Sequence, residues 1–225
     1  MGRGRYPARL NVEPPPPELA ERYLHSWPGH LLYHSPERFP RLASPDLFGN
    51  DHPLELDLGC ATGDLVLALA AQRPEANYVG VDIVAKPLWR AVERAAAAAL
   101  PNLCFVQADA RLVYQQIPVG ALRRAYVHFP APLLRNRQRN QRLIGLRLLE
   151  QMQRCLEPGG VLSVMTDQSA VAAELLSLLP QAPCLRLLPA EQTDPLADLL
   201  KSHYHRRWEA RGRPITRFLL VREAD

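Results

Sequence analysis

The sequence lacks any apolar run that approaches the roughly 20 residues needed to cross a lipid bilayer. Its first segment, MGRGRYPARLNVEPPPPELAERY, also lacks the apolar core that a signal peptide requires. We therefore expect a cytoplasmic protein with no membrane partner.

Cysteine is scarce, and its spacing excludes a second class of protein. The four cysteines stand singly in apolar segments, with no CxxC pair and no cluster of cysteine and histidine, at positions Cys60, Cys104, Cys155 and Cys184. Such cysteines are typical of small core residues in a reducing compartment. The sequence therefore predicts no metal site.

Lysine is almost absent, and arginine concentrates the positive charge in two stretches. Residues 135–149 contain five arginines and no acid, and residues 201–217 contain six basic residues against one glutamate, so each stretch carries +5. The net charge is +4, which leaves about −6 for the rest of the chain. This polarity favours a basic face that binds nucleic acid, although solvated helical faces are an alternative.

The 225 residues, with 47% hydrophobic and 22% charged side chains, suit one globular domain. Residues 1–50 are rich in proline and predict a partly extended N-terminal arm with a short helix at 18–23. Residues 51–225 predict the domain itself. The expected strands are 54–58, 78–81, 103–106, 125–129, 161–165, 185–188 and 215–221, and the expected helices are 64–72, 86–99, 138–156 and 170–179. This alternation predicts an α/β fold, doubly wound and Rossmann-like, with a mostly parallel seven-stranded sheet.

The first strand and its turn, LELDLGCATGDL, carry the first cofactor-binding candidates. Ligands of such sheets bind beyond the carboxyl ends of the strands. Asp57 closes the strand, and Gly59 and Gly63 allow a tight turn into the following helix. The spacing G-x-x-x-G differs from the dinucleotide motif G-x-G-x-x-G, which disfavours a dehydrogenase. A carboxylate here suits the ammonium and sulfonium groups of S-adenosylmethionine.

The next two strands also end in acids. Asp82 follows the second strand, where a carboxylate accepts hydrogen bonds from ribose hydroxyls, and Asp109 follows the third, where it can accept from an adenine amino group. A single acid at a strand end is usually a turn or cap residue. Three in succession predict a nucleoside ligand without phosphate, and hence S-adenosylmethionine as the cofactor.

The segment after the fourth strand, HFPAPLLRNRQRNQR, resembles the bacterial tRNA (guanine-N7-)-methyltransferase family, whose motif there is F-x-D-P-W-P-K-x-R-H-x-K-R-R. Aligned on Phe129 and Pro132, the chain places Arg135 at the substrate-binding lysine of the family. Arg137 and Arg142 are retained. The resemblance implies tRNA as partner and, as product, a guanine methylated at N7 in the variable loop.

Two further motifs extend the resemblance. Thr166 and Asp167 match a T-D pair at the end of the next strand, and residues 206–209, RRWE, align with the C-terminal motif T-x-[FY]-E. The departures from the family include Ala131, which replaces an aspartate that contacts the methyl donor, and Leu133, Gln138 and Arg206. The resemblance implies Ala131 in the cofactor site and Arg135, Asp167, Arg206 and Glu209 in the substrate site.

Guanine N7 has a free lone pair at neutral pH, so methylation can rest on alignment of the reacting atoms. Asp167 and Glu209 are the catalytic candidates, because carboxylates can accept from guanine N1 and N2 and favour the positive charge of the product. Asp167 is alternatively a helix cap, and Trp208 is either a base-stacking residue or a core residue. Alternative functions are a methyltransferase with another substrate and a non-catalytic tRNA-binding relative. The sequence is compatible with a monomer or a homodimer.

Overall fold

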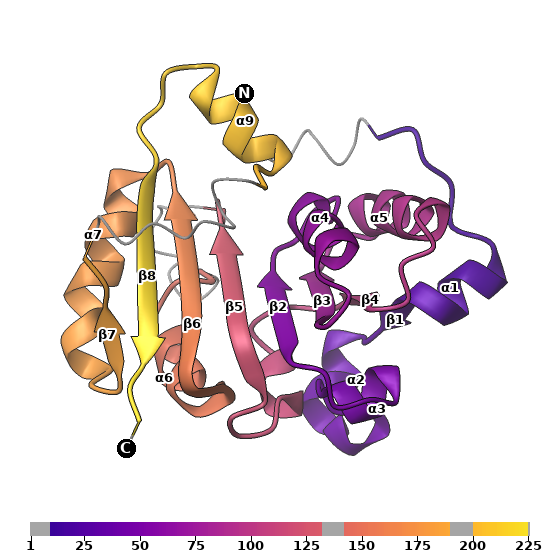
Figure 1. Cartoon of the computed structure of the whole chain (residues 1–225), viewed down its shortest axis with the longest axis horizontal. Coiled ribbons are helices and arrows are strands. Elements are labelled where there is room, and N and C mark those ends of the chain that lie inside the picture. The colour runs from indigo at the N-terminus through magenta and orange to yellow at the C-terminus, as the bar shows by residue number, and fades with distance from the viewer. Residues whose placement is uncertain (1–9, 132–141, 190–199, 225) are drawn as a thin grey trace. The chain divides into compact units, whose positions relative to one another are not determined.

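The computed structural model describes residues 10–131, 142–189 and 200–224. The chain forms two compact units, Met1–Pro118 and Val119–Asp225, each with strands and helices of its own. Figure 1 shows the elements of both units in chain order.

The first unit contains four parallel strands in the order β1-β4-β3-β2. They are β1 (Leu24–Ser26), β2 (Leu54–Leu58), β3 (Asn77–Asp82) and β4 (Leu103–Gln107). All five residues of β2 are buried, including Glu55 and Asp57, so the alternation of apolar and polar residues in LELDL does not mark a solvent-exposed face. The register sets Val81 opposite both Leu58 and Val106, so the carboxyl ends of the three strands meet at one edge.

In the described part of the first unit, residues 10–118, seven short helices accompany these strands. They are α1 (Pro17–Tyr23), α2 (Gly29–His34), η3 (Pro36–Arg38), α3 (Ser44–Phe48), α4 (Asp64–Gln72), α5 (Ala85–Ala97) and η4 (Val113–Gln116). Helix α5 buries Leu88, Ala91, Val92 and Ala95, at positions i, i+3, i+4 and i+7, which is the pattern of one helical face. The expected helices at 64–72 and 86–99 are confirmed to within two residues.

Residues 10–50 hold more structure than their proline content indicates. The short helix expected at 18–23 is present as α1, but β1 also pairs in parallel with β4, and the Trp27 N–H donates to the Gln107 carbonyl at 3.0 Å. Leu32 and Leu42 are fully buried. No periodicity of apolar residues indicates these elements in the sequence, because each element is only three to seven residues long and depends on its contacts with the domain.

The second unit has the strand order β5-β6-β8-β7. Its elements are β5 (Leu122–His128), α6 (Leu146–Cys155), β6 (Leu156–Thr166), α7 (Ser169–Leu178), η6 (Leu179–Gln181), β7 (Leu185–Leu187), α9 (His203–Glu209) and β8 (Thr216–Arg222). Strand β5 pairs with β6 in parallel, whereas β8 runs antiparallel to both β6 and β7.

The α/β class with mostly parallel pairing is confirmed, with three differences in detail. The described residues contain eight strands rather than seven, because β1 was not expected. Helix α6 begins at Leu146 rather than at residue 138, since residues 142–145 are not helical and Gly145 has the extended conformation of an N-cap. Residues 138–141 of the helix expected at 138–156 lie outside the described part of the chain. Helix α9 is the third difference, because the sequence did not predict it.

Candidate functional site

The carboxyl edge of the parallel strands in the first unit brings together the three predicted acids. Asp57 pairs in register with Gly80 of β3, Asp82 pairs with Gln107 of β4, and Asp109 follows two residues later. The Ala108 N–H donates to the Asp82 carbonyl at 3.0 Å, which continues the strand contacts up to Asp109. The three acids thus follow strands that share one carboxyl edge, and their role in cofactor binding stays a prediction.

Asp57 is the most unusual of the three, because its carboxylate is buried and accepts no hydrogen bond from any residue that the structure describes. Burial raises the pKa of Asp57 to about 8, with further increases from the charges of Asp82 and Asp64. A buried carboxylate without a donor is costly unless a cation or donor reaches it. Asp57 is therefore suited to a positively charged ligand.

The turn after β2 is fastened to the end of β3. The N–H groups of Gly59 and Cys60 donate to the Val81 carbonyl at 2.8 and 3.0 Å, and the Ala61 N–H donates to Asp82 Oδ2 at 2.9 Å. Gly63 has φ +69°, and a Cβ there would lie 2.9 Å from Cε1 of Phe105. Gly59 has φ +87° with nothing within 4 Å of such a Cβ, so the backbone over Gly59 is open to a ligand.

Asp82 is oriented by backbone groups. Oδ1 accepts from the Val84 N–H at 2.9 Å and Oδ2 accepts from Ala61, as described above. Burial raises the pKa of Asp82, while these backbone N–H groups and that of Ile83 oppose the increase. Each carboxylate oxygen can accept more than one hydrogen bond, so Asp82 keeps capacity for hydroxyl donors.

Asp109 reaches the same edge but already has a strong partner. The Arg111 backbone N–H and Nε both donate to Asp109 Oδ1 at 2.9 Å, and the other arginine nitrogen donates to Oδ2. The same contact raises the pKa of Arg111. Of the three acids, Asp109 therefore has the least free capacity for a ligand.

In the second unit, the ends of β5 and β6 meet helix α9 in a small apolar cluster. Phe129, Met165 and Trp208 form this cluster, and all three are buried. Phe129 has φ +53° and its N–H donates to the Met165 carbonyl at 2.7 Å. Trp208 is only 7% exposed, so the core alternative for this residue is supported over base stacking. Ala131, two residues after Phe129, is exposed.

Asp167 follows β6 and its side chain has no solvent exposure. Its Oδ2 accepts from Arg213 at 3.0 Å and from the side-chain amide of Gln168 at 2.6 Å. Gln168, rather than Asp167, occupies the N-cap position of α7, and that helix has no side-chain capping bond. The sequence did not single out Arg213, which is one of six basic residues in its stretch.

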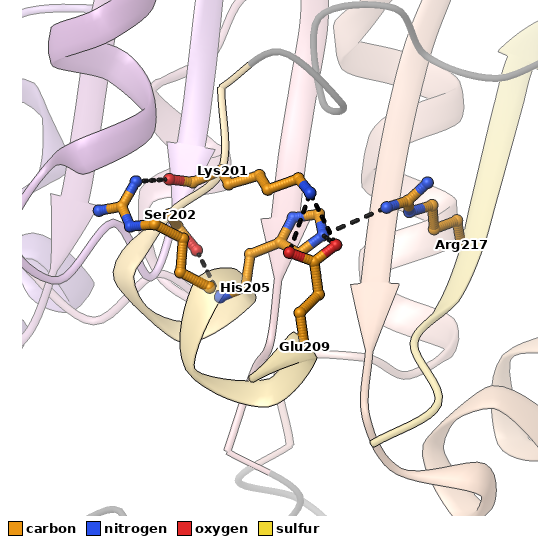
Figure 2. Close-up of polar contacts among 6 residues, drawn as sticks. Lys201, Ser202, His205, Glu209 and Arg217 are labelled. Atoms are coloured by element: carbon orange, nitrogen blue, oxygen red, sulfur yellow. Dashed lines mark hydrogen bonds and ion pairs between the residues drawn. The ribbon is translucent and has the colours of Figure 1, made fainter. Parts of the chain in front are cut away.

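Glu209, at the end of α9, belongs to the polar network in Figure 2. Lys201 Nζ donates to both Glu209 oxygens at 2.8 and 2.9 Å, and Nε2 of the buried His205 lies 3.4 Å from Oε1. The same Nε2 lies 3.2 Å from an Arg217 nitrogen. The hydrogen bond from Lys201 lowers the pKa of Glu209, so this carboxylate is ionised at neutral pH. Ser202 starts the helix by accepting from the His205 N–H at 3.3 Å.

His128 is a half-buried residue that the sequence did not single out. Its Nε2 lies 2.9 Å from the Ser163 hydroxyl, and its ring packs against Tyr126. Burial lowers the pKa of His128 to about 3, with smaller contributions from His205 and Arg217. The imidazole is thus neutral. The only sequence signal is a histidine at the end of an apolar strand, which by itself does not indicate a role.

The two predicted arginines of the substrate site have different outcomes. Arg135 lies outside the described residues. Arg206 is exposed and donates to the Lys201 backbone carbonyl, which holds the start of α9. Around Trp208, the guanidinium carbons of Arg207, Arg211 and Arg213 lie 5.4, 5.4 and 4.4 Å from the ring centroid.

The described residues contain no group of three or more His, Cys, Asp or Glu side chains placed to hold a metal ion. Within the same residues, no helix has the length and apolar character needed to span a membrane.

Comparison with known proteins agrees with this geometry. Residues 51–218 match the family described as "Putative methyltransferase". The tRNA (guanine-N(7)-)-methyltransferases of Chloroflexus aurantiacus and Chloroflexus aggregans are 57% and 56% identical, over 96% and 100% of both chains. The solved structure of the 16S rRNA methyltransferase KamB aligns with a TM-score of 0.54 at 17% identity, covering 79% of this chain and 91% of that one, and so shares the fold. The chain belongs to the tRNA (guanine-N(7)-)-methyltransferase family.

Proposed function

We propose that this protein transfers a methyl group from S-adenosylmethionine to N7 of a guanine in tRNA, at the variable-loop position that the family resemblance implies. The observation that carries the donor assignment is the buried Asp57, which has no hydrogen-bond partner among the described residues and lies beside a glycine turn at the carboxyl edge of parallel strands. The tRNA assignment rests on the relatives at 56–57% identity.

The first unit supplies the groups that hold the donor. Asp57 accepts from the α-ammonium of the methionine moiety, which removes the cost of its burial. Asp82, fixed by two backbone N–H groups, accepts from the ribose hydroxyls. Gly59 leaves backbone open to the donor. Arg111 already donates hydrogen bonds to Asp109. Asp109 therefore accepts from the adenine amino group only with its remaining lone pairs. S-adenosylmethionine, when bound, supplies an electrophilic methyl group on a sulfonium.

The second unit supplies the groups that bind guanine. Glu209 is ionised and partly exposed, so it can accept from guanine N1–H and N2–H. Asp167 is buried and paired, which suits it to stabilise charge on the methylated base over a distance rather than to take a proton. Guanine N7 needs no general base, because its lone pair is free at neutral pH. His128 is neutral, but this reaction has no substrate proton for it to remove.

Ala131 stands where the resembled family has an aspartate that contacts the donor. We propose that donor binding relies on Asp57 and Asp82 rather than on residue 131. The protein acts in the cytoplasm, where its tRNA substrate is found. Arg135 and Arg206 contribute positive charge toward the RNA.

The test is incubation of the purified protein with labelled S-adenosylmethionine and an unmodified tRNA transcript, followed by borohydride reduction and aniline cleavage, which cut RNA at N7-methylguanine. We expect one cleavage site in the variable loop with the wild-type protein and none with Asp57→Ala. Asp51→Ala, an exposed acid of the same unit, is the matched control and retains activity. Label at another atom would support a different substrate, and binding without transfer would support a non-catalytic relative.

A further inference from the structure

Three arginines surround the ring of Trp208, and only one has an acidic partner among the described residues. Arg213 pairs with Asp167 at 3.0 Å. Arg207 and Arg211 each hold the guanidinium carbon 5.4 Å from the ring centroid, and no ion pair to an acid is found for either within the described part of the chain. The cluster thus carries a surplus of two positive charges.

The nearby acids cannot supply the missing charge. Glu209 is held by Lys201 through both of its oxygens, and Asp167 is held by Arg213. The other charged groups around α9, Lys201, Arg206 and Arg217, add positive charge. The cation–π contact with the ring offsets only a small part of this charge. Arg207 in the last helical turn gains from the helix dipole, but Arg211 lies past the end of α9.

The spacing of the two arginines suits a single anion. They are four residues apart in sequence, and the Arg211 N–H donates to the Trp208 carbonyl at 3.1 Å, so a turn follows directly after α9. Both guanidinium carbons lie 5.4 Å from the centroid of the same ring. Stacking against the buried Trp208 restricts both side chains, which lowers the entropy lost when they bind.

We infer that Arg207 and Arg211 form a phosphate-binding site for one phosphodiester group of the RNA substrate, with Trp208 as its support. This inference rests on the proposed function. Guanidinium groups bind phosphate oxygens in a planar, bidentate manner, and contacts to the backbone fix the position of RNA without reading its sequence. Arg213 is excluded from this site because its charge is already paired.

The experiment measures binding of a fluorescently labelled, unmodified tRNA transcript by anisotropy over a range of NaCl concentrations, without methyl donor. For Arg207→Gln/Arg211→Gln we expect about tenfold weaker binding and a salt dependence whose slope falls by about 0.7–0.9 units, because one phosphate contact is lost. Arg207→Lys/Arg211→Lys retains most of the slope. Arg186→Gln is the control, since it removes one positive charge from an exposed arginine of the second unit that pairs with Glu223 at 2.6 Å.

Thermal unfolding of each variant verifies that it is folded, and the KM for tRNA should rise more than kcat falls. A slope equal to that of the wild type, or an equal decrease for Arg186→Gln, would overturn the inference and leave the arginines as cover for Trp208. The wild-type transfer assay separates the two claims. Methyl transfer with an unaltered slope overturns only the phosphate site, whereas weaker binding by the variant without any wild-type transfer overturns only the proposed function.

Discussion

The Arg213 guanidinium lies 3.0 Å from Oδ2 of Asp167, whose side chain has no solvent exposure, and the same guanidinium stacks 4.4 Å above Trp208. One side chain therefore connects the residue that follows β6 to the apolar cluster on α9. An arginine is suited to this arrangement because its planar group can stack and donate at the same time. The contact makes Asp167 a fixed, ionic feature of the second unit.

Replacing Arg213 with glutamine should leave the buried Asp167 carboxylate short of a donor. We expect unfolding to become easier by about 1–3 kcal/mol and kcat to fall between about 10-fold and 100-fold. Denaturant unfolding and steady-state methylation measure the two effects. Arg213→Gln/Asp167→Asn should recover stability, since both partners are changed together; simple addition of the two single losses would show that the pair is not coupled.

Donor binding should release a proton from Asp57. Its pKa is about 8 without ligand, so the carboxyl is largely protonated at neutral pH and must ionise to bind an ammonium group. Calorimetry in buffers of different ionisation enthalpy should show proton release near pH 7 that is absent in Asp57→Asn, together with weak donor binding by that variant. Equal enthalpies in all buffers would contradict this prediction.

The same carboxyl has a defined effect on stability. Because its folded pKa is raised above its ordinary value of 3.8, the folded protein keeps a proton that the unfolded chain loses. The free energy of unfolding should therefore fall as pH rises from about 4 to about 8. Asp57→Asn should flatten this decline in unfolding experiments, with Asp51→Asn, an exposed acid, as control.

The two glycines of the turn should respond differently to alanine. At Gly63 the left-handed φ of +69° coincides with a Cβ position only 2.9 Å from Phe105 and 3.1 Å from Ala91, so strain and a steric clash combine. At Gly59 only the strain of φ +87° applies. We expect Gly63→Ala to cost at least about 2 kcal/mol and Gly59→Ala about 1 kcal/mol, as measured by thermal unfolding. Equal losses would contradict the packing around Gly63.

His128 should make the protein sensitive to acid. Its pKa is lowered to about 3 from an ordinary 6.5, so between these values the unfolded chain binds a proton that the folded protein does not. The stabilisation is complete above about pH 6.5 and is lost as pH falls toward about 3. His128→Gln, which keeps a polar group near Ser163, should lose stability less steeply over this range. His52→Gln, at an exposed position, should behave like the wild type.

The sequence alone determined the fold class and the edge of the sheet at which Asp57, Asp82 and Asp109 lie. Strong local patterns mark β2, α4 and the glycine turn, and the order of strands is enough to bring Asp57, Asp82 and Asp109 to one edge, because parallel strands share their carboxyl ends. The resemblance to the family also came from residues near in sequence.

Only the tertiary structure decided which polar groups are already paired. Arg111 donates to Asp109, and Arg213 donates to Asp167. Neither pairing follows from sequence spacing alone, and the second joins residues that are 46 positions apart. The same holds for β1, which forms because β4 offers it unpaired backbone groups rather than because of its own propensity. Burial and long-range pairing depend on how distant segments pack, and for this reason the charge state of Asp57 and the surplus charge around Trp208 appear only in the folded chain.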